Sequence, residues 1–209
     1  MKVWSDSFSP GAFLPESLAF CRIHPETHVT MAENRNPHLG WSDLPDGTGS
    51  LALICHDPDV PSCGDDVNQE GRVVAASLAR VDFYHWVLLD LDPGLGAIEE
   101  GAFSKGVTVG GKAGPEAPCG AKQGINDYTG WFGDDPEMGG HYFGYDGPCP
   151  PWNDTLMHHY HFTLYALDIA HVDLEGAFDG AAALEAIEGH VLAKASITGV
   201  YTLNPELVA

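Results

Sequence analysis

The sequence predicts a mainly β protein, an antiparallel β-sandwich with long loops and one late helix. Short runs of alternating or continuous apolar residues recur along the chain, separated by turns rich in Gly and Pro. The loops between these runs are long, above all at residues 92–128, which are dense in Gly and Pro. Only residues 179–193 show the apolar spacing of an amphipathic helix. This pattern favours an antiparallel sandwich over repeated βαβ units.

The length and charge of the chain restrict what it can bind. We expect a single domain over residues 1–209. With 9 basic and 30 acidic residues, the formal net charge is −21, which repels nucleic acid and anionic bilayers. No stretch approaches the ~20 apolar residues of a membrane span, and the N-terminus lacks the pattern of a secretory signal. We therefore expect a cytoplasmic protein with no nucleic-acid partner and no stable membrane insertion.

The cysteines predict free thiols rather than disulfides. Their number is odd and none forms a CxxC pair, which argues against both a disulfide framework and a zinc ribbon. They are Cys21, Cys55, Cys63, Cys119 and Cys149.

The first half of the chain contains predicted strands at residues 3–8, 17–23 and 51–56. The third is apolar, and Asp57 and Asp59 continue the parity of its core-facing residues. Prolines within the same DPDVP stretch favour extended backbone but end regular pairing. Both carboxylates are therefore expected at a strand end, pointing the same way as the core.

The central strand is predicted at residues 81–91, with His85 in its middle. Strict alternation places His85 on one face with the apolar residues of its parity. These are Phe83, Val87, Leu89 and Leu91. Burying an unpaired histidine costs about 1–3 kcal/mol, so His85 needs a partner or a cavity. The segments HDPDVP at 56–61 and HHYHF at 158–162 are the candidates to meet it.

The second half is predicted to contain a strand at 158–167, a helix at 179–193 that begins at the N-cap Asp179, and a strand at 195–203. Two acidic, glycine-bearing stretches, residues 62–80 and 131–143, are expected as surface loops, the first with a short helix near its end.

These stretches suggest a pocket built from Asp57, Asp59, His85 and His158, with Tyr145 or Tyr160 nearby. A carboxylate beside a histidine favours its protonated form, so we expect a histidine pKa above the usual ~6.5. A protonated imidazole donates hydrogen bonds to a bound anion.

Other uses of the same residues remain open. His158, His159, His161 and His141 could together form a metal site, although the spacing positions no third ligand. The aspartates with a histidine base could make the protein a hydrolase or a lyase, but no G-x-S-x-G nucleophile elbow occurs. The long loops could also form a surface for a protein partner.

Several motifs occur along the chain in a distinctive order. The strongest are DPDVP (57–61), the HW pair at 85–86, and GYDGPCPP (144–151) followed by HHYHFTLYAL (158–167). Together with NPHLGW (36–41), PDGTGSLAL (45–53) and GINDYTG (124–130), they resemble the phosphatidylethanolamine-binding proteins, and most closely their prokaryotic, Raf-kinase-inhibitor-like branch. The resemblance spans nearly the whole chain, with 62–80 and 131–143 as insertions.

The resemblance implies a β-sandwich of that type with a small pocket for phosphate-like groups. Carried over by position, the ligand-binding residues are Asp57, Asp59, His85, Tyr145, His158 and Tyr160. The walls are Pro58, Pro61, Gly147 and Pro148. We expect non-enzymatic binding of a small anionic or phosphorylated ligand, with no cofactor and no metal, and with a regulatory or inhibitory role open. The resemblance also suggests a homodimer.

Overall fold

The computed structural model describes residues 1–208, and its strands dominate the fold. They are β1 (Lys2–Trp4), β2 (Cys21–His24), β3 (His28–Met31), β4 (Leu39–Ser42), β5 (Ser50–Pro61), β6 (Arg80–Leu91), β7 (Ala97–Ile98), β8 (Lys122–Gln123), β9 (His158–Leu167) and β10 (Val191–Tyr201). The helices are α1 (Tyr128–Trp131) and α2 (Gly180–Ile187), with 3₁₀ turns at Glu16–Leu18, Pro93–Leu95, Pro118–Gly120 and Pro205–Leu207.

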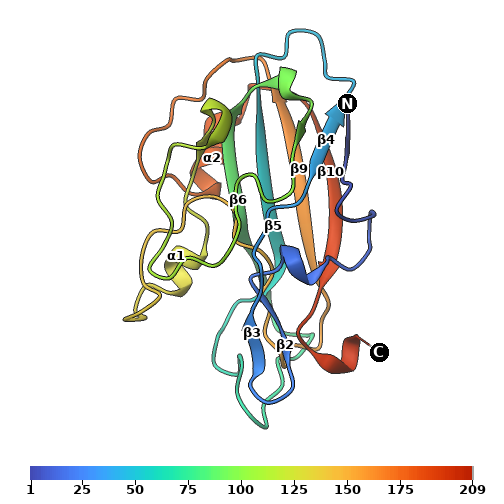
Figure 1. The fold of residues 1–209 in the computed structure, drawn as a ribbon, viewed down its shortest axis with the longest axis vertical. Coiled ribbons are helices and arrows are strands. Elements are labelled where there is room, and N and C mark those ends of the chain that lie inside the picture. The colour runs from blue at the N-terminus through green and yellow to red at the C-terminus, as the bar shows by residue number, and fades with distance from the viewer. Residues whose placement is uncertain (209) are drawn as a thin grey trace.

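The strands form two packed antiparallel sheets and a separate hairpin (Figure 1). The larger sheet has five strands in the order β10-β9-β5-β6-β8, and the smaller has three in the order β1-β4-β7. Strands β2 and β3 pair only with each other and lie beyond one end of the larger sheet. The mainly β, antiparallel sandwich predicted from the sequence is confirmed.

The larger sheet is buried on both faces. One face packs against the smaller sheet and forms a first hydrophobic cluster, which includes Trp41, Leu53, Trp86 and Phe162. The other face packs beneath α2, where Ile54 and Val87 contribute to a second cluster. Strand β9 covers the predicted residues 158–167, and its even-numbered positions face the first cluster and the cavity, as alternation predicts.

β-Bulges break the alternation of β6, so the predicted face was wrong. Cys55 pairs with Trp86, but the next residue, His56, pairs with Tyr84, which leaves His85 as an extra residue in β6. A second irregularity follows near Asp90, whose φ is +58°. The prediction therefore groups residues from both faces, since Phe83 and Leu91 belong to the first cluster whereas Val87 and Leu89 belong to the second. A bulge re-aims one side chain, here that of His85.

Several predicted elements differ in length or type. Helix α2 is shorter than the predicted 179–193, because residues 191–193 pair with β9 instead. Its N-cap is Asp179 as predicted, with a carboxylate that accepts the amide hydrogen of Ala182 at 2.8 Å. None of the helices among residues 1–208 is long and apolar enough to cross a bilayer.

The remaining differences lie in short elements. Strand β1 ends at Trp4, four residues before the end of the strand predicted at 3–8. In the strand predicted at 17–23, the first residues belong to the 3₁₀ turn Glu16–Leu18, and β2 begins only at Cys21. Residues 62–80 contain turns but no helix, and the four-residue helix α1 was not predicted. Such short elements depend on local hydrogen bonds and tertiary packing more than on apolar periodicity.

The prediction of free thiols was wrong for two of the five cysteines. Cys21 and Cys149 form a disulfide, with Cα atoms 4.9 Å apart across 128 residues of sequence. Cys55 is a buried free thiol, and Cys63 and Cys119 are exposed. Local spacing identifies short motifs such as CxxC, whereas this pair is brought together only by the fold.

Candidate functional site

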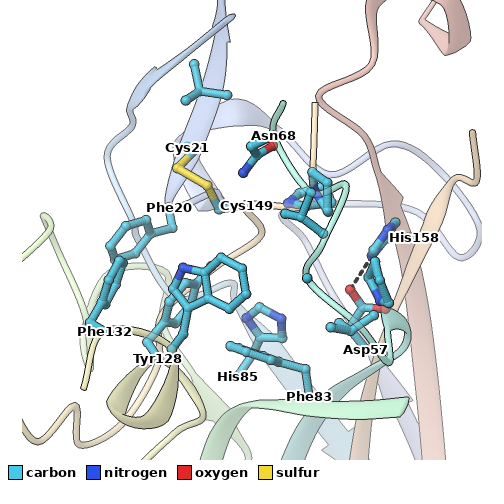
Figure 2. Close-up of a pocket in the computed structure, with 18 of the residues that line it drawn as sticks. Phe20, Cys21, Asp57, Asn68, Phe83, His85, Tyr128, Phe132, Cys149 and His158 are labelled. Carbon is cyan, nitrogen blue, oxygen red and sulfur yellow. Dashed lines mark hydrogen bonds and ion pairs between the residues drawn. A yellow bond between two sulfur atoms is a disulfide. The ribbon is translucent and has the colours of Figure 1, made fainter. Parts of the chain in front are cut away.

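A cavity of about 380 Å³ lies where β5, β6 and β9 approach the β2–β3 hairpin (Figure 2). Most of its lining is apolar. Its walls include Phe20, Val29, Met31, Phe83, Tyr128, Trp131, Phe132, Met138 and Pro151. The ionisable side chains in the lining are few: Asp57, His85 and His158, with the phenols of Tyr128 and Tyr160. A mainly apolar cavity of this size with a few convergent polar groups is typical of a small-molecule site.

His85 lies at the floor of the cavity as a neutral histidine. Its side chain points there because His85 is the extra residue of the bulge in β6. Its Nδ1 lies 2.7 Å from the carbonyl oxygen of Asp146. Because a carbonyl only accepts, Nδ1 carries the proton and Nε2 has a free lone pair. Burial lowers the pKa of His85 to about 4, despite the nearby Asp57 charge.

A buried network holds the Asp146 backbone in place behind His85. The Asp146 carboxylate accepts hydrogen bonds from the side-chain amides of Asn34 at 2.6 Å and Asn126 at 2.7 Å. Its Oδ2 also lies 3.0 Å from Nζ of Lys112. The Asn34 side-chain oxygen in turn accepts the amide hydrogen of Gly147 at 2.8 Å. The GINDYTG and GYDGPCPP motifs thus share this network, which orients the carbonyl that binds His85.

His158 lies at the other side of the floor and is held between two carboxylates. Its Nδ1 lies 2.7 Å from Oδ2 of Asp57, and its Nε2 lies 3.2 Å from Oδ2 of Asp154. Burial by itself would lower the pKa of His158, but the hydrogen bonds to Asp154 and Asp57 outweigh it and raise the pKa to about 9. His158 is therefore an imidazolium at neutral pH, with both N–H groups already bonded.

The network around His158 carries no net charge. Arg80 forms a two-pronged ion pair with Asp154, so the carboxylates of Asp57 and Asp154 are balanced by His158 and Arg80. Both oxygens of Asp57 are also occupied, since Oδ1 accepts the amide hydrogen of Asp59 at 2.8 Å. The floor therefore offers a ligand neither a free cation nor a free carboxylate.

Tyr160 adds the other unpaired polar group. It is 1% exposed, and its hydroxyl lies beside the Asp57 carboxylate but forms no hydrogen bond of regular length and angle with any group among the described residues. Burial, followed by the charge of Asp57, raises the pKa of Tyr160 well above its usual value, so the hydroxyl keeps its proton. The ring of Tyr160 lies 5.1 Å from that of His85, centroid to centroid.

One wall is a stack of aromatic rings. Tyr128 stacks on Phe20 at 4.6 Å and on Phe132 at 5.6 Å, measured between ring centroids. The Tyr128 hydroxyl donates to the carbonyl of Gly147 at 2.8 Å, so it is already satisfied. Both predicted insertions also reach the cavity: residues 62–80 contribute Asn68 and its neighbours, and 131–143 contribute Met138. Both stretches therefore form part of the cavity lining.

The structure brings only some of the predicted site residues into the cavity. Asp57, His85, His158 and Tyr160 line it, together with the predicted wall residue Pro61. The other predicted residues are outside this lining: Asp59, Tyr145, Pro58, Gly147 and Pro148.

Specific contacts explain two of these displacements. A bulge lies between the β5 pairs formed by Asp57 and Val60, and Asp59 turns outward there to bind Nδ1 of His159 at 2.8 Å. Tyr145 is fully buried, and its hydroxyl donates to the carbonyl of Leu18 at 2.8 Å. The predicted rise in histidine pKa occurs at His158, whereas His85 shifts the other way.

Sequence reasoning missed the residues that act behind the floor. Arg80, Asp146 and Asp154 never touch the cavity, but they determine the protonation or orientation of its histidines. The motifs GYDGPCPP and PWNDTLMHHY contained the two carboxylates, although spacing alone did not indicate their partners. No group of three or more His, Cys, Asp or Glu side chains among residues 1–208 is arranged to hold a metal ion.

The fold and site define a β-sandwich protein with an apolar cavity at one end of its larger sheet and an Asp–His floor. A family model described as phosphatidylethanolamine-binding protein matches residues 4–202. The chain belongs to this family.

Two relatives and one solved structure are similar to the chain over most of their length. A UPF0098 protein of Methanothermobacter thermautotrophicus is 35% identical, with 85% of this chain and 89% of the relative covered. UPF0098 protein YbhB of Escherichia coli is 30% identical, with 97% and 100% covered. The crystal structure of E. coli YbcL, described as a new member of the mammalian PEBP family, matches with a TM-score of 0.67, 26% identity, and 96% and 97% covered.

Proposed function

We propose that this protein binds a small phosphate monoester without turning it over, with the phosphate on the cavity floor and the organic group along the aromatic wall. One observation carries the proposal: Nε2 of His85 and the hydroxyl of Tyr160 belong to two side chains that line this cavity, and neither atom has a regular hydrogen-bond partner among the described residues. Nε2 of His85 is open to the cavity, whereas leaving the buried Tyr160 hydroxyl unpaired costs about 1–3 kcal/mol, which a ligand that reaches it can recover.

The charges favour a ligand that brings its own proton. Neutral His85 accepts a hydrogen bond at Nε2, and Tyr160 donates one. A phosphate monoanion has both a P–OH donor and acceptor oxygens, so it complements both groups. The proton can then be shared between the phosphate and Nε2, and the resulting imidazolium–dianion pair is a charge-assisted hydrogen bond. A fixed anion without a proton would first require protonation of His85.

The occupied carboxylates favour binding over hydrolysis. Both Asp57 oxygens are bonded, and Asp154 is shared between His158 and Arg80. Both carboxylates are therefore weaker general bases for a water molecule than an unpaired carboxylate, because their negative charge is already bonded to His158 and, for Asp154, also to Arg80. The volume of about 380 Å³ suits a ligand slightly larger than phosphate itself.

Phenyl phosphate and phenyl sulfate form a matched pair of probes for calorimetric titration. They differ little in shape, but only the phosphate can carry a proton near pH 6. At pH ~6 about one His85 in a hundred is protonated, because its pKa of about 4 lies two units lower. We therefore expect phenyl phosphate to bind about 100-fold more tightly than phenyl sulfate at this pH.

The pH dependence gives a second check. Phenyl phosphate affinity should fall about tenfold per pH unit above its second ionisation near ~6. Phenyl sulfate affinity should instead rise as pH falls towards 4, where His85 becomes charged. Equal affinities for the two probes at pH ~6 would contradict the proton-sharing site. Release of inorganic phosphate that is lost in His85→Gln would favour the hydrolase alternative.

A further inference from the structure

The Cys21–Cys149 disulfide, hereafter the rim disulfide, forms part of the cavity lining. Both cysteines line the cavity, and Figure 2 shows their sulfur atoms between Phe20 and Asn68. Cys21 is the first residue of β2, and Cys149 lies in the GPCPP turn. Cys21 is 7% exposed and Cys149 is half-buried, so Cys149 is the more exposed of the two residues.

The cavity wall that this disulfide anchors is held to the main core at its base, where the Tyr201 hydroxyl donates to the carbonyl of Cys21 at 2.9 Å and Ile23 and Val29 pack against the core. The β2–β3 hairpin contributes Val29, Thr30 and Met31 to the lining, but it joins neither main sheet. An isolated two-stranded hairpin is at best marginally stable in water. Away from its base, His28 binds Glu70 at 2.6 Å and stacks on Trp152 with ring centroids 3.8 Å apart, and both contacts are with loops.

The other side of the disulfide leads directly to the ligand floor. Cys149 lies three residues after Asp146, whose carbonyl binds Nδ1 of His85. The amides of Phe20 and Cys21 donate to the carbonyl of Pro148, at 2.9 and 3.1 Å. One covalent bond therefore connects this wall to the turn that orients His85.

We propose that the rim disulfide is a thiol-exchange site, and that its reduction by a dithiol loosens the β2–β3 wall and weakens ligand binding. This inference rests on the proposed function, because it concerns the same cavity. The dithiol attacks Sγ of Cys149 as a thiolate, forms a mixed disulfide and releases the Cys21 thiolate. Its second thiol then releases Cys149. The reductant becomes a cyclic disulfide, and the protein gains two electrons and two protons.

The physical reason is the loss of a covalent restraint. The loop entropy of the 128-residue segment acts on the unfolded chain and lowers overall stability when the bond is broken. In the folded protein the same break frees the start of β2 from the segment that contains Cys149. Because the hairpin has few anchors beyond its base, that freedom appears first as opening of the wall. Ligand and oxidation are then coupled, and coupling is reciprocal. A ligand that prefers the oxidised form must make the disulfide harder to reduce by the same factor.

The experiment compares oxidised wild type, dithiothreitol-treated wild type and Cys149→Ser, with Cys63→Ser as the control that removes an exposed free thiol. Hydrogen exchange followed by mass spectrometry reports on residues 21–31. Titration with phenyl phosphate at pH ~6 reports on the cavity. Reduction and Cys149→Ser should each speed exchange in residues 21–31 about tenfold or more and weaken phenyl phosphate binding about fivefold or more.

Three further results complete the test. Dithiothreitol should change nothing in Cys149→Ser, and Cys63→Ser should respond to it like wild type. Saturating phenyl phosphate should shift the wild-type reduction equilibrium by the same factor as the affinity ratio. Equal exchange in residues 21–31 before and after reduction, or equal affinities, would overturn the inference. If oxidised wild type binds no phenyl phosphate, the proposed ligand is wrong and the exchange rates alone decide whether the disulfide controls the wall.

Discussion

His85 and His158 line the same cavity and are almost equally buried, 3% and 0% exposed. At neutral pH, however, His85 is neutral and His158 is protonated. Burial lowers the pKa of His85 to about 4, with only a carbonyl bonded to its ring. The pKa of His158 is about 9 because two carboxylates bond to its ring and outweigh the same burial. The hydrogen-bond partners therefore decide the charge of each histidine, and the depth of burial does not.

This difference separates structural from ligand-accessible chemistry. His158 is charged at neutral pH within a network that carries no net charge, and both of its N–H groups are already bonded. His85 is neutral, with one nitrogen left unpaired, so it is the group whose protonation a ligand can change.

Asp154→Asn should have the largest effect, because it removes a carboxylate on which both His158 and Arg80 depend. Removing one partner of a buried ion pair costs about 3–5 kcal/mol, so we expect the free energy of unfolding to fall by about that amount. Urea denaturation measures it. The control is Asp59→Asn, which removes the more exposed pair with His159 and should cost less than about 1 kcal/mol. Similar losses in the two variants would argue against a dominant His158 network.

The pH dependence of stability should show both histidines with opposite sign. The pKa of His158 is raised, so its contribution is complete below pH 6.5 and is lost as pH rises through about 9. The pKa of His85 is lowered, so its protonation favours the unfolded chain as pH falls from 6.5 towards about 4. Each effect amounts to about 3 kcal/mol over its range.

Urea denaturation of two variants assigns these effects. His158→Gln should flatten the alkaline loss, whereas His85→Gln should flatten the acid loss and keep the alkaline one. An unchanged alkaline loss in His158→Gln would mean that another group is responsible.

His85→Gln should also weaken phenyl phosphate binding at pH ~6 by about tenfold or more, because glutamine cannot accept the ligand's proton. Calorimetric titration measures the affinity. His56→Gln is the matched control, since His56 is absent from the cavity lining and neighbours His161 on the other face of the sheet. Unaltered affinity in His85→Gln would remove His85 from the binding site.

Tyr160→Phe should have the smallest effect. Loss of one neutral hydrogen bond to the ligand weakens binding about threefold to tenfold. Stability should stay the same or rise slightly, because the hydroxyl has no regular hydrogen-bond partner among the described residues. Titration together with urea denaturation distinguishes this from a packing role, in which stability would fall and affinity would not.

Much of the fold was readable from the sequence. Apolar alternation located β9, and Asp179 marked the start of α2. These features depend on neighbours within a few residues, where periodicity and capping act directly. The same local information predicted that the side chain of Asp57 continues the face of Leu53 and Cys55, although β5 runs on to Pro61 and does not end before Asp57 as predicted.

Only the tertiary structure decided which residues form the floor and in which state. The extra residue in β6 arises from pairing with β5, so strict alternation could not reveal how His85 reaches the cavity. Asp154 and Arg80 are 74 residues apart, and Cys21 and Cys149 are 128 apart. Pairing at such separations depends on the packed chain. A histidine's pKa depends on those distant partners, which is why the sequence indicated the histidines but not their opposite charges.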